Sequence, residues 1–122
     1  MKTILVIEDN KEIRENTIEL LELKGFHIIA AMNGKVGLNL AKAEKPDMIL
    51  CDIMMPQMNG YEVFAALKED AATAHIPFIF VTASVERSEV ETGLGMGAAG
   101  YIRKPFEAKE LFDAISSCLK EG

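Results

Sequence analysis

Three acidic side chains follow two short apolar stretches, where carboxylates are unusual. Glu8 and Asp9 come directly after the run TILVI, and Asp52 closes the run MILC. Thr82 ends a third run, FIFV, and Lys104 follows GYIR. Two carboxylates about 4 Å apart repel each other by on the order of 4 kcal/mol at an effective dielectric of about 20. Acids brought together therefore favour a cation between them, and their oxygen ligands suit Mg²⁺ or Mn²⁺.

Together these residue types can support phosphoryl transfer to a carboxylate. A divalent cation and the Lys104 ammonium can neutralise a phosphoryl group, and the Thr82 hydroxyl can donate a hydrogen bond to its oxygens. A carboxylate can act as the nucleophile that accepts the group. Asp52 is the candidate acceptor, because it is the lone acid at the end of its strand.

The hydrophobic periodicity predicts the elements that position these residues. Apolar runs predict strands over residues 3–8, 27–31, 47–51, 78–82 and 100–104. Apolar stripes at helical spacing predict helices over residues 11–24, 34–44, 60–69, 86–96 and 107–120. Strands that are apolar on both faces suit an open parallel α/β sheet with helices on both sides. In such sheets ligands bind beyond the carboxyl ends of the strands, so the candidate residues should meet at one edge.

Several local features have structural interpretations. In the second helix, Val36, Leu40 and Ala41 are expected to face the sheet. Asp9, with Glu12 three residues on, fits an N-terminal capping pattern and could serve the helix rather than a metal. The GxGxxG pattern at residues 95–100 is no dinucleotide loop, because it ends a predicted helix and opens a strand, the reverse of the required order.

Composition limits the classes of function. A chain of 122 residues predicts one domain over residues 1–122, and its net charge of −6 argues against a nucleic-acid-binding face. No apolar stretch is long enough for a membrane span and the first residues do not read as a signal peptide, so we expect a cytoplasmic protein without membrane contact. Cys51 and Cys118 are far apart and lack metal spacing, and are expected to be buried or half-buried apolar residues rather than a disulfide.

Four segments resemble the receiver domain of two-component response regulators. They are IEDN at 7–10, DIMMPQMNG at 52–60, VTAS at 81–84 and GYIRKPF at 100–106. The resemblance covers essentially the whole chain. It implies a flavodoxin-like fold with strand order 2-1-3-4-5. It also implies that Asp52 takes a phosphoryl group from the phosphohistidine of a histidine kinase or phosphotransfer protein.

The resemblance also implies a metal site. Asp9 and Asp52 would bind Mg²⁺ directly, with the Met54 main-chain carbonyl as a further ligand and Glu8 acting mostly through water. The side chains of Met54 and Ser84 would flank the phosphoryl group. Because neither can position water as an amide or carboxylate would, slow to moderate autodephosphorylation is expected.

A conformational switch is implied as well. Thr82 and Lys104 would hold the phosphoryl oxygens, and Tyr101 would move inward together with Thr82. Lys104–Pro105 would be a cis peptide bond. The fourth helix, fifth strand and fifth helix would then present a surface to a downstream protein, with the chain monomeric or a weak phosphorylation-dependent dimer.

Three alternatives stay open. A phosphatase of the haloacid dehalogenase type would need a second aspartate where Lys11 stands, and a flavodoxin-like binding module would need a hydroxyl- and glycine-rich loop in place of EDNKEI. The chain could also be the receiver portion of a longer regulator or hybrid kinase. In the favoured interpretation the protein is no enzyme in the usual sense but a signalling phosphoacceptor whose own chemistry is self-phosphorylation and self-dephosphorylation.

Overall fold

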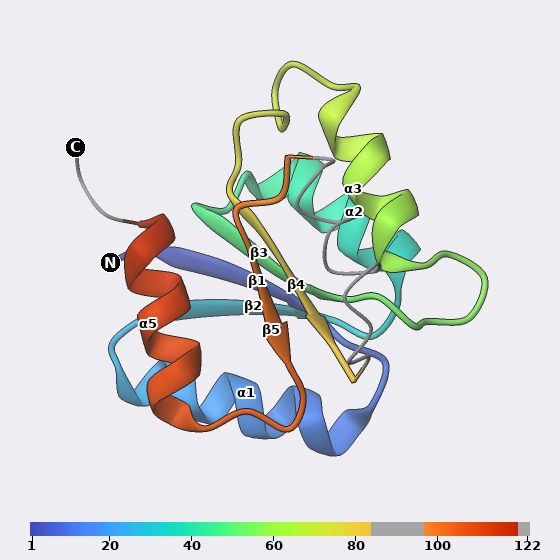
Figure 1. Ribbon diagram of the computed structural model, residues 1–122. Helices are drawn as coiled ribbons and strands as arrows, with labels where there is room; N and C mark the ends of the chain where they lie inside the picture. Colours follow the sequence, from blue (N-terminus) through green and yellow to red (C-terminus); the bar gives the residue numbers. More distant parts are fainter. Residues whose placement is uncertain (84–96, 120–122) are drawn as a thin grey trace.

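The computed structural model describes residues 1–83 and 97–119, and strands and helices alternate along them (Figure 1). The elements are β1 Thr3–Ile7, α1 Lys11–Leu23, β2 His27–Ala31, α2 Gly34–Glu44, β3 Met48–Asp52, α3 Gly60–Lys68, β4 Phe78–Thr82, β5 Gly100–Arg103 and α5 Ala108–Cys118. These bounds agree with the predicted elements to within two residues at each end. The helix expected at 86–96 lies outside the described residues.

The five strands form one parallel sheet in the order β2-β1-β3-β4-β5. This confirms the predicted open α/β fold and its strand order. Ile7 at the end of β1 lies opposite Ala31 of β2 and Cys51 of β3. Asp52 in turn lies opposite Val81 of β4. The register therefore brings the carboxyl ends of neighbouring strands to one edge of the sheet.

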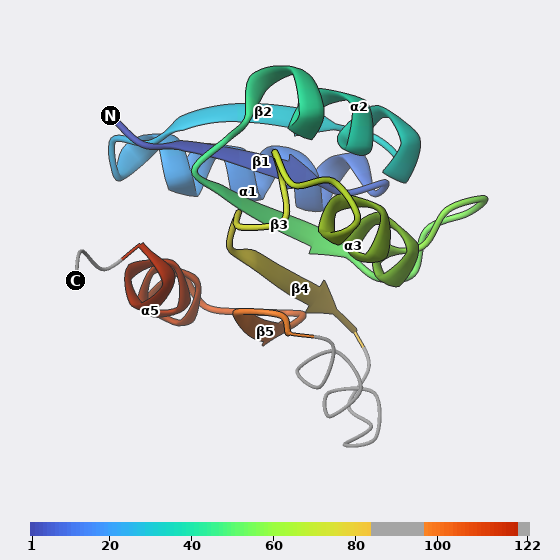
Figure 2. The ribbon, with the colours of Figure 1, turned by 90° about the horizontal axis from the view of Figure 1, so that it is seen from above.

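Helices cover both faces of the sheet, with α2 and α3 on one side and α1 and α5 on the other (Figures 1 and 2). Successive strand residues point to opposite faces, so each strand contributes to two apolar cores. In β3, Ile49 and Cys51 pack with α2 and α3, whereas Met48 and Leu50 pack with α1 and α5. This double burial explains why the three inner strands β1, β3 and β4 are apolar at nearly every position rather than at alternate ones.

Helix α2 differs from its predicted orientation. Leu40 packs against the core and Ala41 is buried as expected, but Val36 is 39% exposed, so the prediction for Val36 is wrong. The residue that faces the sheet is Gly37, and a Cβ added to it would lie 2.6 Å from Cγ1 of Ile7. The helix approaches β1 so closely that only a residue without a side chain fits there, and this turns Val36 outward.

Asparagine side chains cap the first three helices. Asn10 accepts a hydrogen bond from the Ile13 N–H at 3.0 Å, so the alternative role of Asp9 as the cap of α1 is wrong. Asn33 and Asn59 cap α2 and α3 in the same way. Such caps satisfy N–H groups that have no partner within a helix. Asp9 therefore lies before the helix, and its carboxylate is available to the group of acids at the carboxyl edge of the sheet.

Two remaining predictions concern the cysteines and the membrane. Cys51 is buried and Cys118 is half-buried, and both thiols are free, as predicted. Among the helices of residues 1–83 and 97–119, none is both long and apolar enough to cross a membrane.

Candidate functional site

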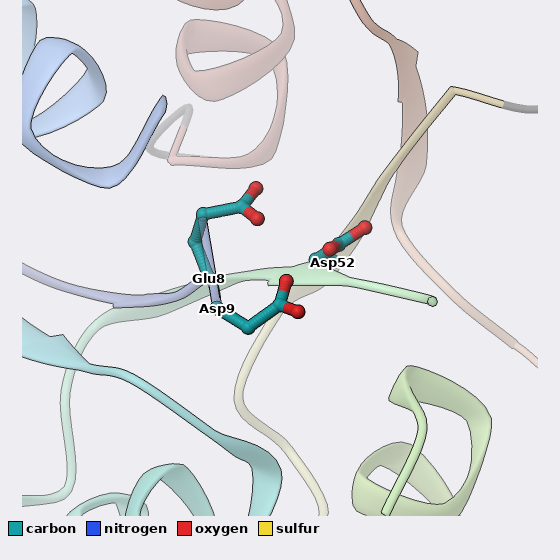
Figure 3. Close-up of side chains that lie close together, drawn as sticks. All are labelled: Glu8, Asp9 and Asp52. Atoms are coloured by element: carbon teal, nitrogen blue, oxygen red, sulfur yellow. The ribbon is translucent and has the colours of Figure 1, made fainter. Parts of the chain in front are cut away.

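Three carboxylates meet at the carboxyl edge of the sheet. Glu8 and Asp9 follow β1, and Asp52 is the last residue of β3 (Figure 3). One oxygen from each of the three lies within 4.8 Å of the others. Glu8 and Asp52 are each 4% exposed, whereas Asp9 is exposed. The cluster therefore has two acids at its buried side and one at its solvent side, and it is open to solvent through Asp9.

Lys104, which follows β5, brings a positive charge to this cluster. Its Nζ atom lies 2.9 Å from Glu8 Oε1 and 3.4 Å from Asp52 Oδ1. Burial by itself lowers the pKa of Lys104, but the hydrogen bond to Glu8 and the nearby Asp52 charge outweigh it and raise the net value. The ammonium is therefore charged at neutral pH and bridges the two buried acids.

One ammonium does not neutralise three acids. Burial, and then the adjacent Glu8 charge, raise the pKa of Asp52 from 3.8 to about 7, and the attraction of Lys104 offsets this only in part. The charge of ionised Asp52 is therefore only partly neutralised by Lys104. Three oxygen donors around an incompletely neutralised charge fit Mg²⁺ or Mn²⁺, which prefer such hard ligands and retain water on their open positions.

The loop between β3 and α3 holds Asp52 in place. The Gly60 N–H donates to the Ile53 carbonyl at 2.9 Å, and a Cβ added to Gly60 would lie 2.5 Å from the Asp52 main-chain oxygen. Asn59 and Glu62 form a reciprocal capping box at the start of α3. The absence of a side chain at Gly60 therefore lets α3 begin directly against the backbone of the candidate acceptor.

Thr82 and Tyr101 lie on neighbouring strands beside the acids. Thr82 is fully buried at the end of β4, and its carbonyl accepts a 2.7 Å hydrogen bond from the Lys104 N–H. The Tyr101 ring packs on Phe80 with centroids 5.9 Å apart, and its hydroxyl lies 3.4 Å from that of Tyr61 on α3. Tyr101 is thus directed toward the α3 side of the sheet.

The predictions for the Lys104–Pro105 peptide bond, Met54 and Ser84 differ in outcome. The Lys104–Pro105 peptide bond is cis. The Met54 side chain is 73% exposed beside the site, and the role of its carbonyl as a ligand stays a prediction. Ser84 lies outside the described residues.

Sequence reasoning missed two residues that hold Glu8. The Asn10 N–H donates to Glu8 Oε2 at 3.2 Å, and Arg14 Nη1 donates to the Glu8 main-chain carbonyl at 2.9 Å. Helical side chains lean toward the N-terminus, so a long cation in the first turn of α1 was a signal that could have identified Arg14.

A groove of about 370 Å³ opens beside Lys104. Its lining is mostly apolar and comprises Ile13, Asn16, Ala83, Lys104, Pro105 and Phe106. The groove lies between α1, the end of β4 and the segment that joins β5 to α5.

Comparison with known proteins shows the family to which the chain belongs. Residues 4–116 match the response regulator receiver domain. The chain belongs to the response regulator receiver domain family. The resemblance found in the sequence is therefore confirmed.

Relatives of this receiver domain include proteins of nearly the same length. The polar-differentiation response regulator DivK of Brucella anthropi is 36% identical over 121 residues, covering 99% of this chain and 98% of DivK. PilH of Pseudomonas aeruginosa is 35% identical over 119 residues, covering 98% of both chains. The structure of the chemotaxis protein CheY4 of Vibrio cholerae superposes with a TM-score of 0.92 at 26% identity, covering 98% of this chain and 99% of CheY4.

Receiver domains like this one also occur within longer proteins. The chain is 39% identical over 118 residues to histidine kinase P4 of Formosa agariphila, covering 97% of this chain but 8% of that protein. It spans about half the length of several transcriptional regulators that it matches, 52% in the case of PhoB of Pseudomonas aeruginosa.

Proposed function

We propose that Asp52 accepts a phosphoryl group from the phosphohistidine of a sensor histidine kinase or phosphotransfer protein. The observation that carries this proposal is the Asp52 carboxylate itself, buried between two acids and an ammonium, with its pKa raised to about 7. Perturbed groups of this kind are typical of functional sites. Residues 1–122 would act as one receiver domain, a signalling phosphoacceptor rather than an enzyme with an external substrate, and the family match over residues 4–116 supports this.

The proposed transfer is a displacement at phosphorus. A deprotonated Asp52 oxygen attacks, an aspartyl phosphate P–O bond forms, the P–N bond to the donor histidine breaks, and the imidazole leaves with its electron pair. Glu8, Asp9, Asp52 and the Met54 carbonyl would hold Mg²⁺ or Mn²⁺. Such a bound cation would neutralise charge on the transferring phosphoryl oxygens. Lys104 and Thr82 contribute a positive charge and a hydroxyl donor to the same oxygens.

The aspartyl phosphate then biases a switch. By analogy with other phosphorylated side chains it carries roughly −1.5 to −2 charges, which draw the Thr82 hydroxyl and the Lys104 ammonium toward the new oxygens. Movement of Thr82 leaves space for Tyr101, which lies on the adjacent strand. A change from 1:99 to 99:1 between two states requires about 5.5 kcal/mol of differential interaction. The altered surface would comprise β5, α5 and the helix expected from the sequence at residues 86–96, and would bind a downstream protein partner.

The proposal is tested with a small phosphodonor in place of the kinase. Purified protein is incubated with acetyl phosphate and Mg²⁺, and its intact mass is measured with and without a chelator. A single phosphoryl adduct that requires the metal is expected. Folded protein that gains no adduct with Mg²⁺ or Mn²⁺ would contradict the proposed function.

A further inference from the structure

Arg14 reaches back from α1 to the edge of the sheet. It lies in the first turn of the helix, four residues after the cap Asn10, and its own N–H donates to the Asn10 carbonyl at 2.9 Å. Its side chain is half-buried, and Nη1 donates to the main-chain oxygen of Glu8 at 2.9 Å. A hydrogen bond from a charged donor such as a guanidinium is stronger than one between neutral groups.

The contact completes a set of hydrogen bonds around Glu8. Its N–H donates to the Ala31 carbonyl at 3.0 Å, its Oε1 atom binds Lys104, and its Oε2 atom accepts from the Asn10 N–H. The main-chain oxygen is the remaining polar atom, and Arg14 binds it. Each polar atom of this buried residue therefore has a partner, as buried polar groups require.

The main-chain oxygen of Glu8 belongs to the peptide group that carries Asp9. Strand β1 ends at Ile7, and its paired register with β2 and β3 stops there. The sheet ladder therefore does not orient the Glu8–Asp9 peptide plane. A hydrogen bond to its oxygen does so, and the orientation of this plane sets the direction in which the Asp9 side chain leaves the backbone toward Asp52.

We propose that Arg14 is a positioning residue of the phosphoacceptor site, which holds the Glu8–Asp9 peptide so that the Asp9 carboxylate faces Asp52 and a bound divalent cation. This inference rests on the proposed metal-assisted function. Arg14 itself contacts neither the carboxylates of the cluster nor a phosphoryl group. It acts through Glu8 and Asp9, as residues behind metal ligands commonly do.

The direction in which cation affinity changes when Arg14 is neutralised distinguishes positioning from a simple charge effect. A nearby guanidinium repels a divalent cation, so removal of its charge alone would tighten cation binding. Loss of the hydrogen bond loosens the Asp9 peptide and would weaken binding. Positioning and simple charge effects thus predict opposite changes when Arg14 becomes neutral.

The experiment compares Arg14→Gln and Arg14→Lys with the matched control Lys11→Gln. Lys11 is exposed at the start of the same helix, so its replacement removes the same unit of charge from the same region. Mn²⁺ affinity is measured by paramagnetic resonance titration on each protein without phosphodonor. We expect Arg14→Gln to bind Mn²⁺ on the order of tenfold more weakly than wild type. Lys11→Gln should bind as wild type does or slightly more tightly.

Affinity for Mn²⁺ in Arg14→Gln that equals or exceeds that of wild type would overturn the proposal. If Arg14→Gln does not fold, Arg14→Lys decides, because it keeps the charge on a side chain of different reach and donor geometry. Weaker binding by Arg14→Lys supports positioning, and an unchanged affinity contradicts it.

A second measurement needs no metal. Hydrogen exchange at the Asp9 and Asn10 amides of the metal-free protein should be faster in Arg14→Gln than in Lys11→Gln, because the turn has lost its support. Equal exchange in the two variants would contradict positioning. Failure of the wild type to bind Mn²⁺ or to be phosphorylated would instead refute the proposed function, so the two failures are distinguishable.

Discussion

The Lys104 ammonium forms a 2.9 Å ion pair with Glu8, a residue 96 positions earlier in the sequence. The pair joins the segment after β5 to the end of β1 across the carboxyl edge of the sheet. The side chains of Lys104 and Glu8 are 12% and 5% exposed, so water screens their charges only weakly. Lys104 is thus the protein's own counter-charge for the acids, and phosphorylation would require it to serve the new phosphoryl oxygens instead.

Replacement of this counter-charge should destabilise the metal-free protein. We expect Lys104→Met to lower the free energy of unfolding by up to about 3 kcal/mol near neutral pH, because buried acids lose their partner. The loss should be smaller in acid, where Asp52 takes up a proton and no longer needs the counter-charge. Urea unfolding at two pH values measures both effects.

The control is the exposed pair that Lys109 forms with Asp113 one turn later on α5, at 2.8 Å. Because exposed pairs contribute little, Lys109→Met should remain close to wild type in stability. Equal stability losses in the two variants would show that Lys104 has no special electrostatic role.

The raised pKa of Asp52 makes the stability of the metal-free protein depend on pH. Asp52 holds its proton more tightly in the folded protein than in the unfolded chain, so the folded state is favoured in acid. The stabilisation of the folded state by protonated Asp52 is complete below 3.8, the pKa of Asp52 in the unfolded chain. It is lost as the pH rises through about 7, the pKa of Asp52 in the folded protein. Urea unfolding between about pH 5 and about pH 8 should therefore show stability falling toward the higher value.

Asp52→Asn and Mg²⁺ give two controls for this pH dependence. The amide does not titrate, so Asp52→Asn should show a flatter profile over the same interval. Saturating Mg²⁺ favours ionised Asp52 and should remove or reverse the fall in the wild type. The same slope in all three samples would mean that another group titrates.

The exposed Met54 side chain predicts a long-lived aspartyl phosphate. A thioether cannot orient attacking water, whereas an amide can donate and accept hydrogen bonds. We expect Met54→Asn to shorten the phosphorylated lifetime several-fold, as measured by loss of the mass adduct after removal of the phosphodonor. Met32→Asn replaces another exposed methionine, after β2, and should leave the lifetime unchanged. A lifetime unaffected by Met54→Asn would refute this role.

Alanine substitutions at Gly37 and Gly60 should distinguish a loss of stability alone from a loss of stability combined with damage to the phosphoacceptor site. Gly37 and Gly60 both lie against β-strand residues with no room for a Cβ, Gly37 beside Ile7 and Gly60 beside Asp52. Alanine at either position should cost about 1–3 kcal/mol of stability through overpacking. Only Gly60→Ala should also slow phosphorylation, because it displaces the Asp52 backbone. Acetyl phosphate kinetics on the two folded variants make the comparison, and equal rates would contradict it.

The sequence predicted most of the fold and the location of the candidate site for a physical reason. Strands buried on both faces are apolar at every position, so Asp52 at the end of such a run was conspicuous. The parallel arrangement then required the strand ends to meet at one edge. Periodicity carried no information on how closely a helix approaches the sheet, and for this reason Val36 was assigned to the wrong side of α2. The contact that turns it outward involves Gly37 and Ile7, residues distant in the sequence.

Local hydrogen bonds were harder to predict than strand ends. Asp9 and Asn10 are both good capping residues, and the choice between them depends on where the chain leaves β1. The role of Arg14 depends on the orientation of one peptide group beyond that strand. Such choices depend on whether one residue takes the extended or the helical backbone conformation, which residue types alone do not specify.

The assignment of Asp52 as the acceptor is tested most directly by locating the phosphoryl group on the chain. Protein phosphorylated with acetyl phosphate and Mg²⁺ is reduced with borohydride, which converts an aspartyl phosphate to homoserine, and peptides are then sequenced by mass spectrometry. Homoserine is expected at position 52 of the wild type and at no position of the Asp52→Asn variant. Modification at Glu8 or Asp9 instead, or an undiminished adduct in folded Asp52→Asn, would contradict the assignment of Asp52 as the acceptor.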